Sequence, residues 1–335
     1  MCTALSVLAG YHYFGRNLDL EVSYGEAITV TPRKMPLPYR MENTYNYHLA
    51  LIGMAIVEKG YPLYFDATNE YGLSMAGLNF PGNAHYNNPV SGKYNITPFE
   101  FIPWVLGSCT DIEQAKGLIK DTNLVDIQFS EDLPLSPLHW MISDENSSIV
   151  VEPTTNGIRI YEDPVGVLTN NPPFPYHMLN LAGYMGVRSD RPENRICPGI
   201  ELDEYSRGMG GMGLPGDLSS ASRFVRAAFT KSNSTCGNSD EGGMTQFFHI
   251  LDSVQQVKGC CDLGDGKYEI TVYSSCCNTD LGIYYCRTYD NSRIVGVDMN
   301  SMNLDAVEPY VFTLPRKQDV MMLNRPTSSS PGHTP

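Results

Sequence analysis

The chain has 335 residues, nine cysteines, 42% hydrophobic residues, and 23 Lys and Arg against 37 Asp and Glu. The formal net charge of −14 argues against a protein that neutralises nucleic-acid phosphates, because no long basic run is present. The longest apolar runs, such as 49–57, fall short of the ~20 residues of a membrane-spanning helix, so we expect no membrane insertion.

The first third of the chain predicts antiparallel strands, because short β-branched and aromatic stretches alternate with turn residues. These stretches lie at 4–8, 11–16, 27–31, 49–57 and 73–78. Two helices are expected next, over the apolar segment 99–106 and over 110–120. The second opens on a capping-box pattern, Thr110-Asp111-Ile112-Glu113.

Strands and helices alternate in blocks through the rest of the chain. Strands are predicted at 138–142, 148–151, 158–161, 166–168, 268–273, 281–287 and 294–297, and helices at 219–231 and 244–257. This order favours an α+β fold with antiparallel sheets and helices packed outside them, and disfavours a doubly wound sheet. We expect a single domain over 1–326 and a disordered Ser/Pro/Gly-rich tail over 327–335.

The cysteines favour a reducing compartment. Nine is an odd number in a long chain, and the amino terminus lacks the basic head of a secretory signal peptide, so we expect a cytoplasmic protein. The adjacent pairs Cys260-Cys261 and Cys276-Cys277 lack the two- to four-residue spacing usual for zinc ligands. We therefore expect no metal and no other cofactor.

Cys2 becomes the first residue if the initiator methionine is removed, which its small side chain permits. A leading cysteine carries both a thiol and a free α-amine, whose reference pKa of ~7.7–8.0 suits it as a base for its own thiol. The alternative is an incidental buried cysteine near a terminus.

Two charged residues, Arg16 and Asp19, follow a short turn that can return the chain to its own beginning. Arg16 near the sulfur would favour the thiolate, and Asp19 near the amine would orient it. A local Arg/Asp ion pair at the end of a hairpin is the other interpretation.

Further polar residues are candidates for the same site. Asn79 and the Asn170-Asn171 pair end apolar strands, where a side-chain amide can serve a developing oxyanion, although Asn beside Pro or Gly is also ordinary turn chemistry. Arg223 lies in the first turn of the helix predicted at 219–231. The helix dipole disfavours a cation there, so it indicates a carboxylate partner or a site to serve.

Together these motifs resemble the choloylglycine hydrolase family of N-terminal nucleophile hydrolases, and within it the bile salt hydrolases of gut bacteria. The resemblance covers nearly the whole chain. It runs in order through Met1-Cys2-Thr3, Phe14-Gly15-Arg16-Asn17-Leu18-Asp19, Gly77-Leu78-Asn79-Phe80, Leu138-His139-Trp140, Leu168-Thr169-Asn170-Asn171-Pro172, Gly213-Leu214-Pro215-Gly216-Asp217, Ser222-Arg223-Phe224 and Asp298-Met299-Asn300.

The resemblance implies a four-layer αββα sandwich, with two antiparallel sheets between helical layers, and commonly a homotetramer. It implies that Cys2 is the nucleophile after methionine removal. The residues around it would be Arg16, Asp19, Asn79, Asn170 and Arg223, with Asn170 chosen over Asn171 because the family pattern fixes the first of the pair.

The resemblance also suggests residues that bind the substrate. A steroid pocket would be lined by Leu18, Tyr24, Phe65, Phe129 and Leu135, for each of which ordinary core packing is the alternative. Arg207 would meet the carboxylate or sulfonate of a conjugate, or else lie solvated at a subunit contact.

The implied reaction is hydrolysis of glycine- or taurine-conjugated bile acids through a cysteine thioester, with acyl transfer to an amine as a side activity. Penicillin V acylase, with the same fold and nucleophile, is the nearest alternative activity. A non-catalytic protein that binds bile acids is the alternative from another class.

Overall fold

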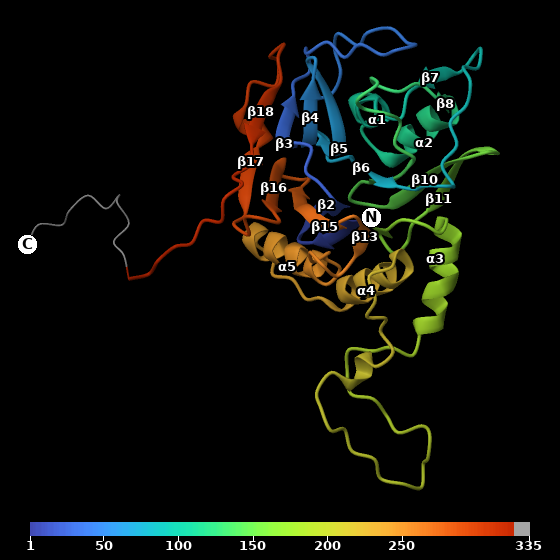
Figure 1. Ribbon diagram of the computed structural model, residues 1–335, viewed down its shortest axis with the longest axis vertical. Helices are drawn as coiled ribbons and strands as arrows, with labels where there is room; N and C mark the ends of the chain where they lie inside the picture. The colour runs from blue at the N-terminus through green and yellow to red at the C-terminus, as the bar shows by residue number, and fades with distance from the viewer. Residues whose placement is uncertain (325–335) are drawn as a thin grey trace, which may run out of the picture.

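The computed structural model describes residues 1–324, so the tail predicted at 327–335 lies outside the described residues. Two large antiparallel sheets dominate it (Figure 1). The six-stranded sheet has the order β12-β1-β2-β15-β16-β17. Its strands are β1 (Cys2–Ala9), β2 (Tyr11–Leu20), β12 (Val167–Leu168), β15 (Ile270–Asn278), β16 (Ile283–Thr288) and β17 (Val295–Asp298).

The eight-stranded sheet has the order β11-β10-β9-β6-β5-β4-β3-β18. Its strands are β3 (Ala27–Thr31), β4 (Leu51–Glu58), β5 (Tyr61–Asn69), β6 (Ser74–Asn79), β9 (Leu138–Ser143), β10 (Ser148–Thr154), β11 (Gly157–Glu162) and β18 (Tyr310–Thr313). Two small pairs complete the strands: β7 (Tyr94–Ile96) with β8 (Thr122–Leu124), which is parallel, and β13 (Asp262–Gly264) with β14 (Lys267–Tyr268).

Helices cover the outer faces of both sheets, which gives the predicted four-layer αββα arrangement (Figure 1). The helices are α1 (Phe101–Ser108), α2 (Ile112–Lys120), α3 (Phe174–Leu181), α4 (Ser220–Asn233) and α5 (Asp240–Asp252), with short 3₁₀ turns η1 (Ala182–Tyr184), η2 (Met209–Gly211) and η3 (Met299–Ser301). α1 packs on β4, β5 and β6, whereas α4 and α5 pack on β1. The inner faces of the sheets meet where β1 and β2 contact β6.

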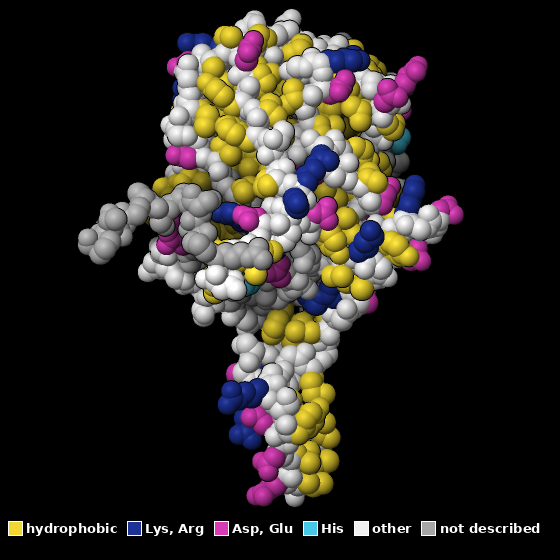
Figure 2. Space-filling model, turned by 60° about the vertical axis from the view of Figure 1, so that its left-hand side comes forward, with side chains coloured by type: hydrophobic (Ala, Val, Ile, Leu, Met, Phe, Trp, Pro, Cys, Tyr) yellow, Lys and Arg dark blue, Asp and Glu magenta, His cyan; other side chains and the backbone are white. Residues whose placement is uncertain are grey.

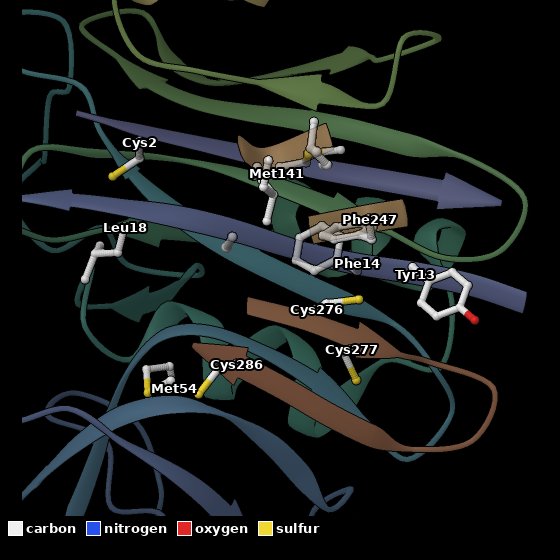
Figure 3. Packing of buried hydrophobic residues seen from close by; sticks show 14 of the residues in the cluster. Cys2, Tyr13, Phe14, Leu18, Met54, Met141, Phe247, Cys276, Cys277 and Cys286 are labelled. Carbon is white, nitrogen blue, oxygen red and sulfur yellow. The ribbon is translucent and has the colours of Figure 1, made fainter. Parts of the chain in front are cut away.

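Strand alternation divides the buried residues into two hydrophobic clusters. On β4, Ile52 and Met54 join the cluster between the sheets, while Leu51 and Ala55 join the cluster under α1. The two sets point to opposite faces because successive side chains of a strand alternate. Figure 3 shows Met54 and Cys286 from the two facing sheets within the first cluster. Both faces of the eight-stranded sheet are therefore buried over its centre.

An extended segment between η1 and α4 projects from the body as an arm (Figure 1). Residues 185–219 carry no regular structure apart from the η2 turn. Several large apolar side chains are exposed here, among them Met185, Ile196, Ile200, Leu202, Tyr205 and Met212. In Figure 2 the hydrophobic atoms of the arm gather along one side and its charged atoms along the other.

Several predicted elements differ from the observed ones. The strand predicted at 268–273 continues to Asn278, and the helix predicted at 244–257 is instead Asp240–Asp252. The observed helix is capped by Ser239, whose side chain accepts the Gly242 N–H. The prediction placed the start of the helix too late because Gly242 and Gly243 are poor helix formers. The sequence pattern predicts no element at β5, β18, α3 or the short β7, β8 and β13. In the described part of the chain, no helix is long and apolar enough to cross a membrane.

Candidate active site

Cys2 is the first residue of β1 and lies directly opposite Leu18 of β2. The two strands form a hairpin through Gly10, whose φ of 75° is a conformation that glycine adopts without steric cost. Because paired residues project to the same side of a sheet and the period is two, Cys2, Leu18 and Arg16 share one face. The hairpin therefore brings Arg16 to the side of the sheet that carries the thiol.

Arg16 is fully buried between the two sheets. Its Nη1 donates hydrogen bonds to the carbonyl oxygens of Phe65, 3.0 Å away, and Gly77. Its Nε and Nη2 have no hydrogen-bond partner among the described residues. The guanidinium therefore offers free N–H groups beside the cavity that Cys2 also lines.

Asp19 faces away from Arg16, so the local Arg16/Asp19 ion pair considered above does not form. Its Oδ1 accepts the Thr271 hydroxyl at 2.6 Å, and its Oδ2 lies 4.0 Å from Nη1 of Arg223. Complete burial raises the pKa of Asp19, while the positive charge of Arg223 opposes that rise. Asp19 and Arg223 therefore form a buried pair next to the first residues of β1, and Arg16 is not part of it.

Arg223 reaches the site from α4, which begins after the capping residue Ser219. Its Nη1 donates to the carbonyl oxygen of Cys2 at 2.5 Å and to Oγ1 of Thr3 at 2.7 Å. Its Nη2 donates to Oδ1 of Asn170 at 2.8 Å. The buried cation in the first helical turn therefore has a carboxylate partner and lies against the first residues of β1.

The two candidate asparagines meet beside Cys2. The backbone N–H of Cys2 donates to Oδ1 of Asn170 at 2.6 Å, and Nδ2 of Asn170 donates to the carbonyl oxygen of Asn79 at 2.7 Å. Asn79 ends β6 and lines the same cavity as Cys2. The neighbouring Asn171 instead bonds the Pro81 carbonyl. Of the adjacent pair, Asn170 is therefore the residue that contacts Cys2.

Met1 precedes this cluster and is paired with the end of β2. Its ammonium donates to the Asp19 carbonyl at 2.8 Å and forms an ion pair with Glu269, and the Asp19 N–H donates to the Met1 carbonyl at 3.0 Å. While Met1 is present, contacts with Asp19 and Glu269 therefore fix the amino end of β1.

A cavity of about 420 Å³ opens beside Cys2. All five residues predicted for a steroid pocket lie in its wall: Leu18, Tyr24, Phe65, Phe129 and Leu135. The wall has other apolar members that were not predicted, including Ile56, Ile102 and Leu133. Their segments carry no motif, and a strand residue that lines a cavity has the same pattern as one that packs in a core. The wall is thus largely apolar, with Arg16 and Asn79 beside the sulfur.

Arg207 is the one candidate that lies neither in the cavity wall nor among the residues that contact the start of β1. It lies exposed on the arm, apart from the residues of the cavity wall. Any contact between Arg207 and a ligand remains a prediction.

The nine cysteines are all free thiols. Figure 3 shows Cys276 and Cys277 on β15 within the core, well apart from Cys2. Cys260 is exposed and Cys261 is half-buried. Within residues 1–324, no three metal-binding side chains cluster closely enough to hold an ion. The two adjacent pairs therefore differ, since one packs in the core and the other lies at the surface.

Comparison with known proteins gives a consistent result. A family model described as "Linear amide C-N hydrolases, choloylglycine hydrolase family" matches residues 2–312. The chain is 53% identical to a bile salt hydrolase/transferase of Lactiplantibacillus plantarum over 314 residues, which are 94% of this chain and 97% of that protein.

Two solved structures define the fold similarity. A cysteine-to-alanine variant of conjugated bile acid hydrolase from Clostridium perfringens superposes with a TM-score of 0.90 and 36% identity, over 97% of this chain and 100% of the other. Penicillin V acylase from Agrobacterium tumefaciens superposes with a TM-score of 0.71 over 90% of this chain and 88% of the other, at 18% identity. The second likeness concerns the fold alone.

Proposed function

Because this chain belongs to the choloylglycine hydrolase family of linear amide C–N hydrolases, we propose that it cleaves the amide bond joining a bile acid to glycine or taurine. The observation that carries the proposal is the position of Cys2, which lies at the wall of a largely apolar cavity beside Arg16 and Asn79. An apolar wall suits a steroid, and the polar end suits the amide.

The nucleophile in this proposal is the Cys2 sulfur, after removal of Met1. The freed α-amine takes the thiol proton, and Oδ1 of Asn170, which already accepts the Cys2 N–H, orients that amine. Arg16 stabilises the negative sulfur through its unpaired N–H groups. Arg223, paired with Asp19, fixes the start of β1 by donating to the Cys2 carbonyl.

The thiolate attacks the amide carbonyl, and a tetrahedral oxyanion forms. Asn79 lines the cavity, and in this proposal its side-chain amide donates to that oxygen. The α-ammonium then protonates the departing amine, which leaves a thioester between the bile acid and Cys2. Water activated by the same amine hydrolyses the thioester, whereas a second amine in place of water gives acyl transfer.

In this proposal the substrate is bound by short-range apolar contacts and not by long-range electrostatic attraction. Both partners are anionic, so the long-range field of the chain slows their encounter. Burial of the steroid against Leu18, Tyr24, Phe65, Phe129 and Leu135 supplies the attraction, at roughly 25 cal/mol per Å² of apolar surface before ordering costs.

Parallel assays on glycocholate, taurocholate and penicillin V test the substrate. We expect hydrolysis of at least one bile salt at a kcat/KM above that for penicillin V. Cleavage of penicillin V alone would contradict the proposal.

The nucleophile needs its own test. We expect Cys2→Ala to abolish turnover, and mass spectrometry of active protein to show a chain that begins at Cys2. Full turnover by Cys2→Ala, or Met1 retained on all active protein, would contradict the assignment. Retained bile acid binding without any turnover by the unaltered chain would favour a non-catalytic binding protein instead.

We further propose that the chain forms one domain over 1–326 and assembles as a homotetramer in the cytoplasm. The apolar side of the arm supports the assembly, because a contiguous exposed apolar surface marks an interaction site (Figure 2). Nine free thiols are compatible with a reducing compartment.

A further inference from the structure

Asp66 of β5 is a buried carboxylate that lies between the two sheets. Its Oδ1 accepts the Tyr273 hydroxyl at 2.5 Å, and its Oδ2 accepts the hydroxyls of Tyr284 at 2.6 Å and Ser275 at 3.3 Å. These three donors come from β15 and β16 of the six-stranded sheet, whereas Asp66 belongs to the eight-stranded sheet. The carboxylate therefore links the sheets through three hydroxyl groups.

Arg16 is tied to the same carboxylate by two short routes. The Ser275 hydroxyl accepts the Arg16 backbone N–H at 3.2 Å while it donates to Asp66. The carbonyl of Phe65, the residue before Asp66, accepts Nη1 of Arg16 at 3.0 Å. The main chain of Arg16 is thus fixed by Ser275, which bonds Asp66, and its side chain by the carbonyl of Phe65, the neighbour of Asp66 in the chain.

β2 and β15 approach each other closely next to Arg16. A Cβ placed on Gly15 would clash with the Ser275 carbonyl oxygen, so β2 and β15 meet at Gly15 without room for a side chain. This close approach leaves Arg16, the next residue, beside Ser275, whose hydroxyl accepts its backbone N–H.

The charges of the two residues are complementary. Burial raises the pKa of Asp66, but the nearby Arg16 and the hydroxyls of Tyr273 and Tyr284 favour its anionic form. In the described part of the chain, Arg16 has no direct ion pair with a carboxylate. Asp66 therefore lies within electrostatic reach of the buried cation without occupying the N–H groups that face the cavity.

We propose that Asp66 is a positioning residue for the amide hydrolysis: fixed by Tyr273 and Tyr284, it holds Arg16 so that Nε and Nη2 stay free for the Cys2 sulfur. This inference rests on the proposed function. It separates two tasks, because the carbonyl oxygens of Phe65 and Gly77 accept Nη1 while Asp66 holds the Ser275 hydroxyl that accepts the Arg16 backbone N–H.

The test compares Asp66→Asn with a matched control, Asp240→Asn. Asp240 also accepts two tyrosine hydroxyls, from Tyr285 at 2.5 Å and Tyr13 at 3.2 Å, but it lies at the start of α5, away from the cavity wall. We expect Asp66→Asn to lower kcat between roughly 10- and 100-fold, with KM changed less than about threefold, because a small misplacement of a catalytic group is costly. We expect Asp240→Asn to keep kcat within about twofold.

A second readout separates positioning from a purely structural role. The rate of Cys2 alkylation by iodoacetamide is measured against pH in both variants. The charged groups around Cys2 and its cavity are Arg16, Asp19, Glu21, Asp132, Arg223, Glu269 and the amino terminus.

We expect the alkylation profile of Asp66→Asn to move to higher pH, because Arg16 is no longer held beside the sulfur. A move to lower pH would mean that Asp66 only opposes the charge of Arg16, and would overturn the proposal.

Other outcomes are also decisive. Folded Asp66→Asn with unchanged kcat, or an equal loss in Asp240→Asn, would overturn the proposal. If Asp66→Asn does not fold, Tyr273→Phe carries the test, since it removes one hydroxyl donor and leaves the carboxylate. A loss of kcat of about threefold or more at constant KM supports the proposal, and unchanged kcat overturns it. An unaltered chain that cleaves no bile salt refutes the proposed function instead.

Discussion

The backbone N–H of Cys2 donates to the side-chain oxygen of Asn170, 2.6 Å away, although 168 positions separate the two residues. The bond joins the first residue of β1 to the segment that follows β12, the neighbouring strand. Removal of Met1 would turn this amide N–H into the α-amine. The same oxygen would then orient the group that moves the proton.

Replacement of Asn170 tests this relationship. We expect Asn170→Ala to lower kcat by roughly 10²-fold, because both the α-amine and Arg223 lose the oxygen that they share. Asn171→Ala is the control, since the Asn171 side chain bonds the Pro81 carbonyl instead. Steady-state kinetics on one bile salt checks both variants, and equal losses would refute the choice of Asn170.

Asn79→Ala should impair catalysis without impairing folding. Among the described residues, the Asn79 side chain has no hydrogen-bond partner that the variant would leave unpaired, so we expect the midpoint of urea unfolding to stay nearly constant. Loss of an oxyanion donor should lower kcat by about 10²- to 10³-fold. Normal turnover would exclude Asn79 from the oxyanion site.

Arg223→Lys should affect both stability and rate. A lysine keeps the charge but cannot reproduce the four hydrogen bonds to Leu218, Cys2, Thr3 and Asn170. We expect the free energy of unfolding to fall by about 2 kcal/mol and kcat to fall with it.

The matched control for Arg223 is Arg226→Lys. Arg226 lies on the same helix but donates to backbone carbonyls outside the site, among them those of Pro215 and Asp217, so this variant should retain kcat. Similar kcat values for both variants would contradict the role of Arg223.

The pH dependence of stability should show the contribution of His12. This side chain is buried between the hydroxyls of Ser6 at 2.9 Å and Thr279 at 2.8 Å, and burial lowers its pKa to about 4 against the opposing charges of Asp280 and Asp144. A lowered histidine pKa means that the unfolded chain binds the proton first. Stability is therefore complete above pH ~6.5 and is lost as the pH falls toward 4.

The size of this effect is measurable by urea unfolding at pH 7 and pH 5. From the two pKa values, His12 alone should cost about 2 kcal/mol between these pH values. His12→Gln should reduce the difference by up to that amount, whereas substitution of the exposed His249 should leave it unchanged. An equal pH dependence in wild type and His12→Gln would show that His12 is protonated in the folded state.

The arm provides a test of assembly. We expect the double variant Ile200→Asp and Leu202→Asp to lose the tetramer in analytical ultracentrifugation, because two charges would replace exposed apolar side chains of the arm. Val257→Asp, at a similarly exposed apolar residue of the body, should keep the assembly. A tetramer that survives the double substitution would place the interface elsewhere.

Sequence patterns predicted the layered fold and most of its strands, because hydrophobic alternation and turn residues are local properties. The prediction failed where local signals conflict. β5 contains Pro62 and the charged Asp66, which weaken its strand pattern, yet it lies in the middle of a sheet with both faces buried. The short α3 lies among prolines that usually mark a turn.

The sequence by itself determined which residues were candidates for the site, because its motifs occur in a fixed order along the chain. Cys2, Arg16, Asn79, Asn170 and Arg223 can each be named from local sequence, whereas the five predicted residues of the cavity wall follow from the family resemblance. Each of the first five residues lies in a short motif whose chemistry can be recognised without knowing its neighbours in space.

Only the tertiary structure decided the partner of each group. Asp19 pairs with Arg223 and not with Arg16, and the main chain of Arg16 is bonded to Ser275, which in turn bonds Asp66. Arg16 and Ser275 are 259 positions apart in the chain, and Asp19 and Arg223 come from different elements. Strand pairing, sheet stacking and helix packing must all be complete before such residues can exchange a hydrogen bond, and no local pattern records which distant residue will be the partner.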